Sequence, residues 1–414
     1  MADTSSAQRL MQRLEAFARH TDDGGRLTRL YLSPAHKAAA EELVGWMREA
    51  GLSVEMDALG TVRGRYEATT PGAPALLIGS HIDTVRDAGR YDGTLGVLAG
   101  LAAVEELGRK GERFPFAIEV IAFGDEENIR FPTTLMSSRA LTGDFDARWL
   151  DARDEAGVRV ADALLTFGGN PQGVAGLRRE RDSVLAYVEM HIEQGPVLEA
   201  EGLPVGIVSV IAGSARHQVT VTGFAGHAGT VPMHLRRDAG TAAAEMLLAV
   251  ERCATSCGIV ATVGRLVVEP GASNVIPGLA RFTIDIRAPI DEVRRVAFDD
   301  LRGEMEAIAA RRGVGLDVSR MFDVPATACS PVIVAGLEAS VARVGITPRQ
   351  LPSGAGHDAM AMARLCPMGM LFVRCKEGIS HNPAESITAD DADVVLRVLL
   401  DFVRAFAPER LRSG

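Results

Sequence analysis

The chain has 414 residues, 47% of them hydrophobic and 24% charged, which is the balance of a globular protein long enough for two domains. Its formal net charge of −10 and its 5% of aromatic residues argue against a general nucleic-acid binder, which would be basic and rich in base-stacking rings. No apolar run approaches the roughly 18–20 residues of a membrane span, and the N-terminus lacks the apolar core of a signal peptide. The five cysteines are an odd number without a C-x-x-C pair. We therefore expect a cytoplasmic protein that has no disulfides and binds neither nucleic acid nor membrane.

The first 210 residues alternate between helical and extended patterns. In chain order the expected elements are a helix that Ser33 and Pro34 open and Gly51 ends, strands at 52–57, 61–66 and 75–79, a buried helix at 93–108 and an interior strand at 116–123. Short, wholly apolar strands that alternate with helices are typical of a largely parallel sheet covered on both faces. This part of the chain therefore predicts an α/β domain.

The order of elements changes between residues 211 and 322. The expected elements there are a strand at 216–223, a helix at 238–256, strands at 259–268 and 281–288, a helix at 291–312 and a strand at 315–322. This is the ferredoxin-like order. An α/β pattern then resumes with a helix at 331–344, a strand at 368–374 and a helix at 389–406. We predict an α/β catalytic domain of residues 1–210 and 323–414, interrupted by an α+β domain of residues 211–322.

Polar side chains follow the apolar strand at 75–79. His81 and Asp83 come directly after it, and α/β enzymes place their sites in loops at the carboxyl ends of such strands. Because the two residues are two apart on an extended segment, their side chains project to the same side, so the carboxylate of Asp83 could hold the ring of His81. An H-x-D pair alone is weak, and an incidental role is the alternative.

Acidic side chains occupy two further element ends. Asp92 precedes the helix at 93–108, where an acid usually caps the helix, although its two carboxylate oxygens allow a second role. Asp125, Glu126 and Glu127 follow the strand at 116–123. Three consecutive acids repel one another, so a bound cation would justify the cluster, and a solvated acidic turn is the alternative.

Two histidines follow two more extended runs. His191 comes after an apolar run, and His381 lies beyond the strand at 368–374. Imidazole and carboxylate ligands together suit Zn²⁺, Mn²⁺ or Co²⁺ better than Ca²⁺. Three histidines and two or three acids match two ions better than one, with one Asp shared between the ions.

Seven short motifs occur along the chain. In chain order they are GSHIDTV, YDGTLGV, FGDEENIRFP, MHIEQGPVLE, GHAGTVPM, SGAGHDAM and GISHNPAE. This set resembles the hydantoinase/carbamoylase family of binuclear metallo-amidohydrolases, which includes allantoate amidohydrolases, N-carbamoyl-L-amino-acid hydrolases and β-ureidopropionases. The motifs run from about residue 79 to 385, so the resemblance covers most of the chain. It implies a zinc-peptidase-like catalytic domain with an inserted lid and dimerisation domain.

The resemblance also implies roles for the residues of these motifs. His81, Asp92 and His191 would hold one divalent metal ion, and Asp92, Glu127 and His381 would hold the other, the ions being Mn²⁺, Zn²⁺, Co²⁺ or Ni²⁺. Glu126 would be the general base that takes a proton from the attacking water and carries it to the leaving nitrogen. Asp83 would be counted with the catalytic residues because its carboxylate would hold the ring of His81 in place.

The inserted domain would supply the remaining groups. His227 in GHAGTVPM matches the family's lid histidine, which reaches into the partner subunit's site in a homodimer and stabilises an oxyanion. Asn274 and Arg287 match substrate contacts, with Arg287 offering a bidentate edge to a carboxylate. Outside that domain, Gln194 would hydrogen-bond the ureido group, and Gly356 would let the backbone approach the ligand closely.

The implied reaction is hydrolysis of a linear C–N bond in a ureido acid. We favour allantoate, converted to ureidoglycine or ureidoglycolate with ammonia and carbon dioxide, because Arg216 stands where allantoate-type members tend to carry an arginine. Residues 369–374 and the GHDAM segment resemble the corresponding segments of N-carbamoyl-L-amino-acid hydrolases more closely. An N-carbamoyl-L-amino-acid hydrolase or a β-ureidopropionase is therefore the alternative to an allantoate amidohydrolase.

Two further classes stay open. A dipeptidase or aminoacylase of the same metal group would more often have a carboxylate in the place of His191. A non-catalytic, metal-stabilised binding dimer would not need the spare carboxylate of Glu126. The sequence also leaves open whether His217 touches substrate or faces solvent.

Overall fold

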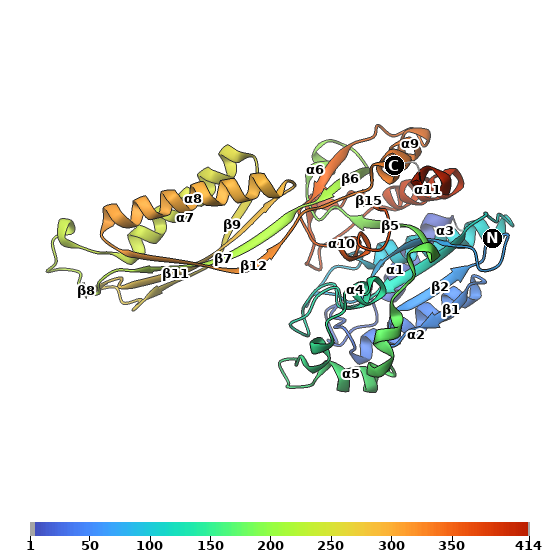
Figure 1. Cartoon of the computed structure of the whole chain (residues 1–414), viewed down its shortest axis with the longest axis horizontal. Coiled ribbons are helices and arrows are strands. Elements are labelled where there is room, and N and C mark those ends of the chain that lie inside the picture. The colour runs from blue at the N-terminus through green and yellow to red at the C-terminus, as the bar shows by residue number, and fades with distance from the viewer. Residues whose placement is uncertain (1–4, 413–414) are drawn as a thin grey trace. The chain divides into compact units, whose positions relative to one another are not determined.

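The computed structural model describes residues 5–412, so residues 1–4 and 413–414 of the expected catalytic segments lie outside the described part. The backbone divides into two compact units (Figure 1). Unit 1 comprises the chain up to Ser209, Cys329–Leu351 and the chain from Ala355 on, and unit 2 comprises Val210–Ala328 and Pro352–Gly354.

A nine-stranded sheet, most of whose residues belong to unit 1, has the order β1-β2-β4-β3-β5-β15-β6-β13, with β14 paired to β6. Its strands are β1 (Ser53–Met56), β2 (Val62–Tyr66), β3 (Ala75–His81), β4 (Ala117–Phe123), β5 (Val184–Ile192), β6 (Val205–Ile211), β13 (Thr327–Ala328), β14 (Gln350–Ser353) and β15 (Met368–Val373). The inner strands β4, β3, β5 and β15 are parallel, and every residue of β3 and β4 is buried. Burial on both faces explains why these strands are continuous apolar runs in the sequence.

Helices accompany this sheet. They are α1 (Ser6–Phe17), α2 (Pro34–Glu49), α3 (Thr94–Arg109), α4 (Met136–Thr142), α5 (Val160–Phe167), α6 (Val197–Ala200), α9 (Pro331–Arg343), α10 (Asp358–Met362) and α11 (Ala389–Ala405). The Ser33 side chain accepts a hydrogen bond from the His36 amide and Pro34 occupies the first turn, as the sequence predicts for the start of α2. Helix α3 lies so close to β5 that a Cβ at Gly96 would stand 2.2 Å from the Met190 carbonyl oxygen. A glycine is therefore required at the helix–sheet contact behind the loop that precedes α3.

Unit 2 has the ferredoxin-like arrangement. Its elements are β7 (Gly213–Thr222), β8 (Gly226–His227), α7 (Ala239–Cys257), β9 (Val260–Glu269), β10 (Val275–Ile276), β11 (Leu279–Ala288), α8 (Asp291–Arg312) and β12 (Gly315–Val324). The four long strands form an antiparallel sheet in the order β12-β7-β11-β9, and α7 and α8 cover one of its faces (Figure 1). Alternate residues of β7 and β11 point into the core beneath the helices, as in Val219 and Ile284. The expected fold class is confirmed.

The structure also bears on two features considered from the sequence, membrane spans and disulfide bonds. Within residues 5–412, every helix is too short or too polar to cross a bilayer. All five cysteines are free thiols.

A buried arginine ties the loops around His81 and Asp92 to the N-terminal segment. Arg29 is 1% exposed, and its guanidinium donates to the carbonyl oxygens of Ile82 and Phe17 and to the hydroxyl of Thr94. Its Cζ also lies 4.6 Å from the centroid of the Phe17 ring.

We expect Arg29→Met to lower the free energy of unfolding by about 3–5 kcal/mol, because the buried acceptors lose their donor. The midpoint and slope of urea unfolding measure the change. Arg26→Met is the control, because the Arg26 side chain is 66% exposed and its nearest ion-pair contact, to Asp87, is 3.8 Å long. Equal stability of the two variants would contradict the anchoring role of Arg29.

Candidate metal centre and active site

The histidines and acids singled out in unit 1 meet at one edge of the large sheet. His81 ends β3, Glu126 and Glu127 follow β4, and His191 lies near the end of β5. His381 lies in the loop beyond β15, and Asp92 precedes α3. Because β4, β3, β5 and β15 are adjacent and parallel, their carboxyl ends come together, and the loops bring these side chains together with them.

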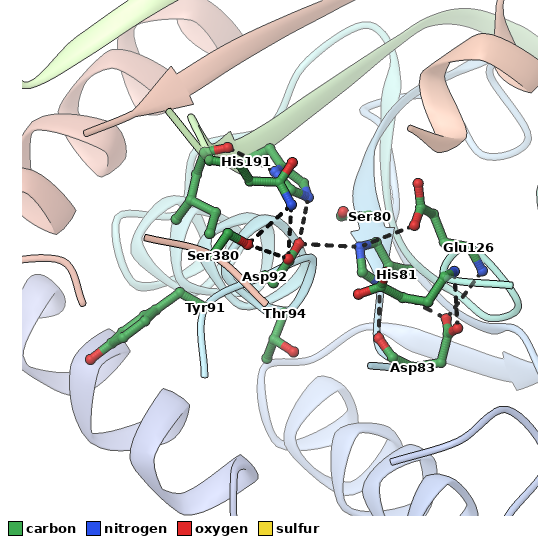
Figure 2. Close-up of polar contacts among 12 residues, drawn as sticks. Ser80, His81, Asp83, Tyr91, Asp92, Thr94, Glu126, His191 and Ser380 are labelled. Atoms are coloured by element: carbon green, nitrogen blue, oxygen red, sulfur yellow. Dashed lines mark hydrogen bonds and ion pairs between the residues drawn. The ribbon is translucent and has the colours of Figure 1, made fainter. Parts of the chain in front are cut away.

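Asp92 lies between the histidines (Figure 2). Its Oδ1 is 3.2 Å from His191 Nε2 and 3.7 Å from His81 Nε2. Its Oδ2 is 3.3 Å from His381 Nε2, which is itself 3.6 Å from Glu127 Oε2. Of the four groups of possible ligand atoms in the described part of the chain, two share Asp92, namely His81 with Asp92 and His191, and Asp92 with Glu127 and His381. Each oxygen of Asp92 faces one of these two groups. The remaining groups are His81 with Glu126 and Glu127, and Glu189 with His191 and His357.

The rings of two histidines are oriented by main-chain oxygens. The Nδ1 of His81 is 2.9 Å from the carbonyl oxygen of Asp83, and the Nδ1 of His191 is 2.9 Å from that of Ile192. A carbonyl oxygen can only accept, so both rings carry a proton on Nδ1, which leaves Nε2 as the nitrogen with the lone pair when the ring is neutral. This is the tautomer that a metal ligand needs.

The Asp83 carboxylate lies farther from the His81 ring than a hydrogen bond allows. Its carboxylate is 3.9 Å from His81 Nδ1 and instead accepts hydrogen bonds of 3.3 Å from the amides of Glu126 and Glu127. Asp83 thus holds His81 through its main chain and the loop after β4 through its side chain. The H-x-D pair therefore orients the His81 ring through the carbonyl oxygen of Asp83 and not through its carboxylate.

Hydrogen bonds fix the loop that contains Asp92, and the residues that make them were not predicted from the sequence. Gln194 Nε2 and Ser380 Oγ both donate to Asp92 Oδ2, at 2.8 Å each. The Glu385 carboxylate accepts hydrogen bonds from the amides of Tyr91 and Asp92. Ser380 and Glu385 belong to the GISHNPAE motif, so the motif was the available signal. The cap role considered for Asp92 is absent, because Gly93 is the N-cap of α3 and no side chain caps it.

The three consecutive acids have separate surroundings. Asp125 has a φ of 68° and points away into the fold, where it accepts from the hydroxyl of Thr133. Glu126 Oε2 lies 3.9 Å from His81 Nε2, and Glu127 faces His381. The cluster is therefore no solvated turn. Two of its members belong to the site and one to the core.

Burial and neighbouring charges shift the pKa values of these groups. Burial, aided by the charges of Glu127 and Asp358, raises the pKa of Glu126 well above its ordinary value. Burial and the Asp92 charge likewise raise the pKa of Glu127 to about 7. Burial alone would raise the pKa of Asp92, but the contacts with the histidines outweigh it and hold that pKa well below its ordinary value. Asp92 is therefore the fixed negative charge of the site.

The residues present fit divalent metal ions. His191 Nε2 and Glu127 Oε1 are buried without a hydrogen-bond partner among residues 5–412, and both residues belong to the ligand groups that share Asp92. Orphaned buried donors and acceptors of this kind are costly unless a ligand satisfies them. Imidazole nitrogens and carboxylate oxygens are ligands of Zn²⁺, Mn²⁺ and Co²⁺. Glu189 also lies near His191, but Ser80, Tyr187 and the amide of Ala359 already donate hydrogen bonds to both oxygens of its carboxylate.

Unit 2 brings two of its predicted site residues together. The two-residue strands β8 and β10 pair His227 with Val275, and the Ala228 amide donates to the carbonyl oxygen of Asn274. The exposed ring of His227 accepts a hydrogen bond from the Gly229 amide on Nδ1. Its proton is therefore on Nε2, which can donate outward.

A second pair of predicted residues meets on the open face of the unit 2 sheet. Arg216 and Arg287 both bind Asp285, so the Nε and Nη2 edge that Arg287 was expected to offer to a carboxylate is occupied. His217 points to the opposite face, where it stacks on Phe298 at 3.6 Å between ring centroids. The His217 side chain is therefore buried, and it points away from the side chain of Arg216. Gly356 is exposed in the loop after β14.

Comparisons with known proteins agree with this geometry. The model of peptidase family M20/M25/M40 matches residues 77–405. A probable allantoate deiminase of Oryza sativa subsp. japonica is 42% identical over 94% of this chain and 87% of its own. An N-carbamoyl-L-amino acid amidohydrolase of Geobacillus stearothermophilus is also 42% identical, over 95% of this chain and 96% of its own. The structure of a hydantoinase/carbamoylase family amidase from Burkholderia multivorans superposes with a TM-score of 0.90 and 34% identity over 96% of both chains.

The family resemblance read from the motifs is thereby confirmed, and with it the hydrolytic reaction class. The match spans the loops that carry His81, Asp92, Glu127, His191 and His381. The chain therefore belongs to peptidase family M20/M25/M40 and, within it, to the hydantoinase/carbamoylase amidases, metal-dependent hydrolases of non-peptide C–N bonds.

Proposed function

We propose that the enzyme hydrolyses the linear C–N bond of a ureido acid and that allantoate is its substrate, converted to ureidoglycine or ureidoglycolate with ammonia and carbon dioxide. The observation that carries the proposal is the pair of ligand groups that share Asp92, with Glu126 as a buried carboxylate beside them. Relatives named allantoate deiminase in rice and Arabidopsis thaliana, at 42% and 40% identity, support the substrate.

The site would hold two divalent ions drawn from Mn²⁺, Zn²⁺, Co²⁺ and Ni²⁺. His81 and His191 would bind one ion, Glu127 and His381 the other, and Asp92 both. When bound, such ions polarise a carbonyl group and lower the pKa of water.

Glu126 is the proposed proton carrier. It is near His81 yet belongs to neither of the two groups that share Asp92, so a carboxylate remains for acid–base work. Its raised pKa suits a group that takes a proton from the attacking water and returns it to the leaving nitrogen. Asp83 would keep Glu126 in place through the hydrogen bond to its amide.

Four polar side chains and one glycine are the proposed substrate contacts. We assign this role to Gln194, Arg216, Asn274, Arg287 and Gly356, with the two arginines supplying positive charge for the carboxylate. Gln194 lies beside the metal centre, where its Nε2 donates to Asp92.

We also propose that residues 211–322 form a lid and dimerisation domain and that the enzyme is a homodimer. His227 follows the end of β7, whereas Arg216 lies near its start, roughly 20 Å away at about 3.3 Å per residue. The two clusters of one chain are thus too far apart for one small substrate. His227 and the neighbouring Asn274 would therefore serve the partner subunit's site, where the outward Nε2 proton of His227 would stabilise an oxyanion. The five free cysteines fit the reducing cytoplasm, where we place the enzyme.

An N-carbamoyl-L-amino acid is the second candidate substrate. The cavity beside Arg216 is lined by Ile259, Val260 and Met321, an apolar surface that suits an aliphatic side chain better than a second ureido group. The Geobacillus relative supports the same class.

Ammonia release decides between them. We expect Mn²⁺- or Zn²⁺-loaded enzyme to hydrolyse allantoate with a kcat/KM at least about tenfold above those for N-carbamoyl-L-amino acids and N-carbamoyl-β-alanine. Only allantoate has a second ureido group, which the hydroxyls of Thr262 and Thr283 beside Arg216 could bind. The reverse order would replace allantoate by the second candidate. If none of these three kinds of substrate released ammonia and the enzyme hydrolysed dipeptides or acyl amino acids instead, the ureido-acid proposal would be contradicted.

A further inference from the structure

The open face of the unit 2 sheet carries a cavity of about 740 Å³. Of the residues that line it, three are charged, namely Arg216 on β7 and Asp285 and Arg287 on β11. The rest of the lining is apolar or neutral, including Thr262, Thr283 and Gly354. The lining therefore has a net charge of +1.

Hydrogen bonds join the three charged residues into one unit. Arg216 and Asp285 are directly opposite each other on β7 and β11, and Arg287 is the next residue of β11 on the same face. Arg216 Nε donates to Asp285 Oδ2 at 2.8 Å. Arg287 donates from Nε and Nη2 to the two oxygens of Asp285, at 2.8 Å and 3.0 Å. Both carboxylate oxygens are therefore engaged.

The two arginines differ in what they leave open. Arg287 also donates from Nη1 to the carbonyl oxygen of Gly354, so each of its three nitrogens has an acceptor. Arg216 uses only Nε, and within residues 5–412 its Nη1 and Nη2 donate to no other atom. Its guanidinium lies 5.5 Å from the centroid of Phe322, and its side chain is 54% exposed. Arg216 is thus the residue of the cavity whose open edge, Nη1 and Nη2, is free to donate two hydrogen bonds to a ligand carboxylate.

We propose that Asp285 is the specificity-determining and positioning residue of this cavity: it holds the two arginines and neutralises one of them, so that the cavity accepts a ligand with a single carboxylate, which binds the open edge of Arg216. The proposal rests on the proposed function, because it takes this cavity as the carboxylate-binding part of the ureido-acid site. It applies equally to allantoate and to N-carbamoyl amino acids with neutral side chains, since each carries one carboxylate.

The charge balance explains the expected selectivity. One carboxylate brings the charge of the lining and ligand to zero. A ligand with two carboxylates leaves an uncompensated negative charge beside Asp285, and like charges in a partly buried site repel. The hydrogen bonds of Asp285 also fix Arg216 before the ligand arrives, so less side-chain entropy is lost on binding.

Calorimetric titration of the metal-free full-length chain with N-carbamoylglycine and N-carbamoyl-L-aspartate tests the proposal. The wild type should prefer N-carbamoylglycine. In Asp285→Asn the charge of the lining rises to +2, and we expect the preference to shift toward N-carbamoyl-L-aspartate by about tenfold. Asp285→Glu keeps the charge and should keep the preference, and Arg216→Met should weaken binding of N-carbamoylglycine by about tenfold.

Glu269→Gln is the matched control, because Glu269 on β9 pairs with Arg281 on the same sheet face at 2.8 Å but lies outside the cavity. It should change neither affinity. A preference ratio within twofold of the wild type in Asp285→Asn, or unchanged binding in Arg216→Met, would overturn the proposal. Binding by the metal-free chain needs no turnover, so failure of the ammonia assay and failure of this assay are separate results.

Discussion

Glu126→Gln is expected to lower kcat on the preferred ureido acid by about 10²–10⁴-fold while the protein keeps its bound metal, because general acid–base groups contribute rate factors of that size. The glutamine has nearly the shape of the carboxyl group but cannot accept the proton of the attacking water. Glu126 also forms a possible ligand group with His81 and Glu127, but it approaches His81 only to 3.9 Å and lies outside the two groups that share Asp92. As the proposed proton carrier it is not needed to hold either ion, so metal content should stay at the wild-type level. Steady-state kinetics and elemental analysis of the same preparation measure both quantities.

The neighbouring acid offers a matched contrast. Glu127 faces His381 at 3.6 Å and shares a ligand group with Asp92, so Glu127→Gln should lose metal as well as turnover. Wild-type turnover in Glu126→Gln would show that Glu126 is not the proton carrier. Loss of metal in both variants would instead make Glu126 a ligand.

The helices and strands of this fold were predictable because each leaves its apolar pattern within its own short segment of the sequence. Helix α8 spans Asp291–Arg312, as the sequence predicts, and the strands at 75–79 and 116–123 form β3 and β4 with shifts of a residue or two at their ends. Burial on both faces makes a parallel strand a continuous apolar run, and such runs are visible without any knowledge of their neighbours. The strand order of unit 2 followed from the order of its elements.

The histidines and acids of the site were predictable for a related reason. Residues that follow the carboxyl ends of neighbouring parallel strands must meet, whatever the distance between them in the chain. The sequence could not show which of Asp125, Glu126 and Glu127 turns away. That depends on the left-handed backbone at Asp125 and on Thr133, eight residues later, which binds its carboxylate.

The supporting contacts were beyond sequence reasoning because they join distant segments. Glu385 binds the amides of Tyr91 and Asp92 across almost 300 positions. Asp285 joins Arg216 and Arg287 only because the register of β7 and β11 places them together. Such contacts depend on register and loop conformation, which single-residue patterns do not encode.

Asp92→Asn is expected to lower the affinity for both metal ions, by at least about 100-fold, since changes in supporting residues alone typically cost 10–100-fold. Asp92 is the one residue common to the two ligand groups, and its charge is held by contacts with three histidines. An asparagine at this position keeps the volume but removes the negative charge that both groups share. His381→Ala should by contrast release only the ion of the second group, because His81 and His191 remain.

Metal content after extensive dialysis, followed by competition with a chromogenic chelator, separates these outcomes without reference to activity. Asp87→Asn is the control, since the side chain of Asp87 is 41% exposed and belongs to neither ligand group. Near-wild-type binding of two ions by Asp92→Asn would show that the groups do not depend on a shared carboxylate. Loss of one ion in Asp92→Asn and of two in His381→Ala would reverse the assignment. Loss of both ions only in Asp92→Asn makes this aspartate the bridge on which the proposed two-ion site depends.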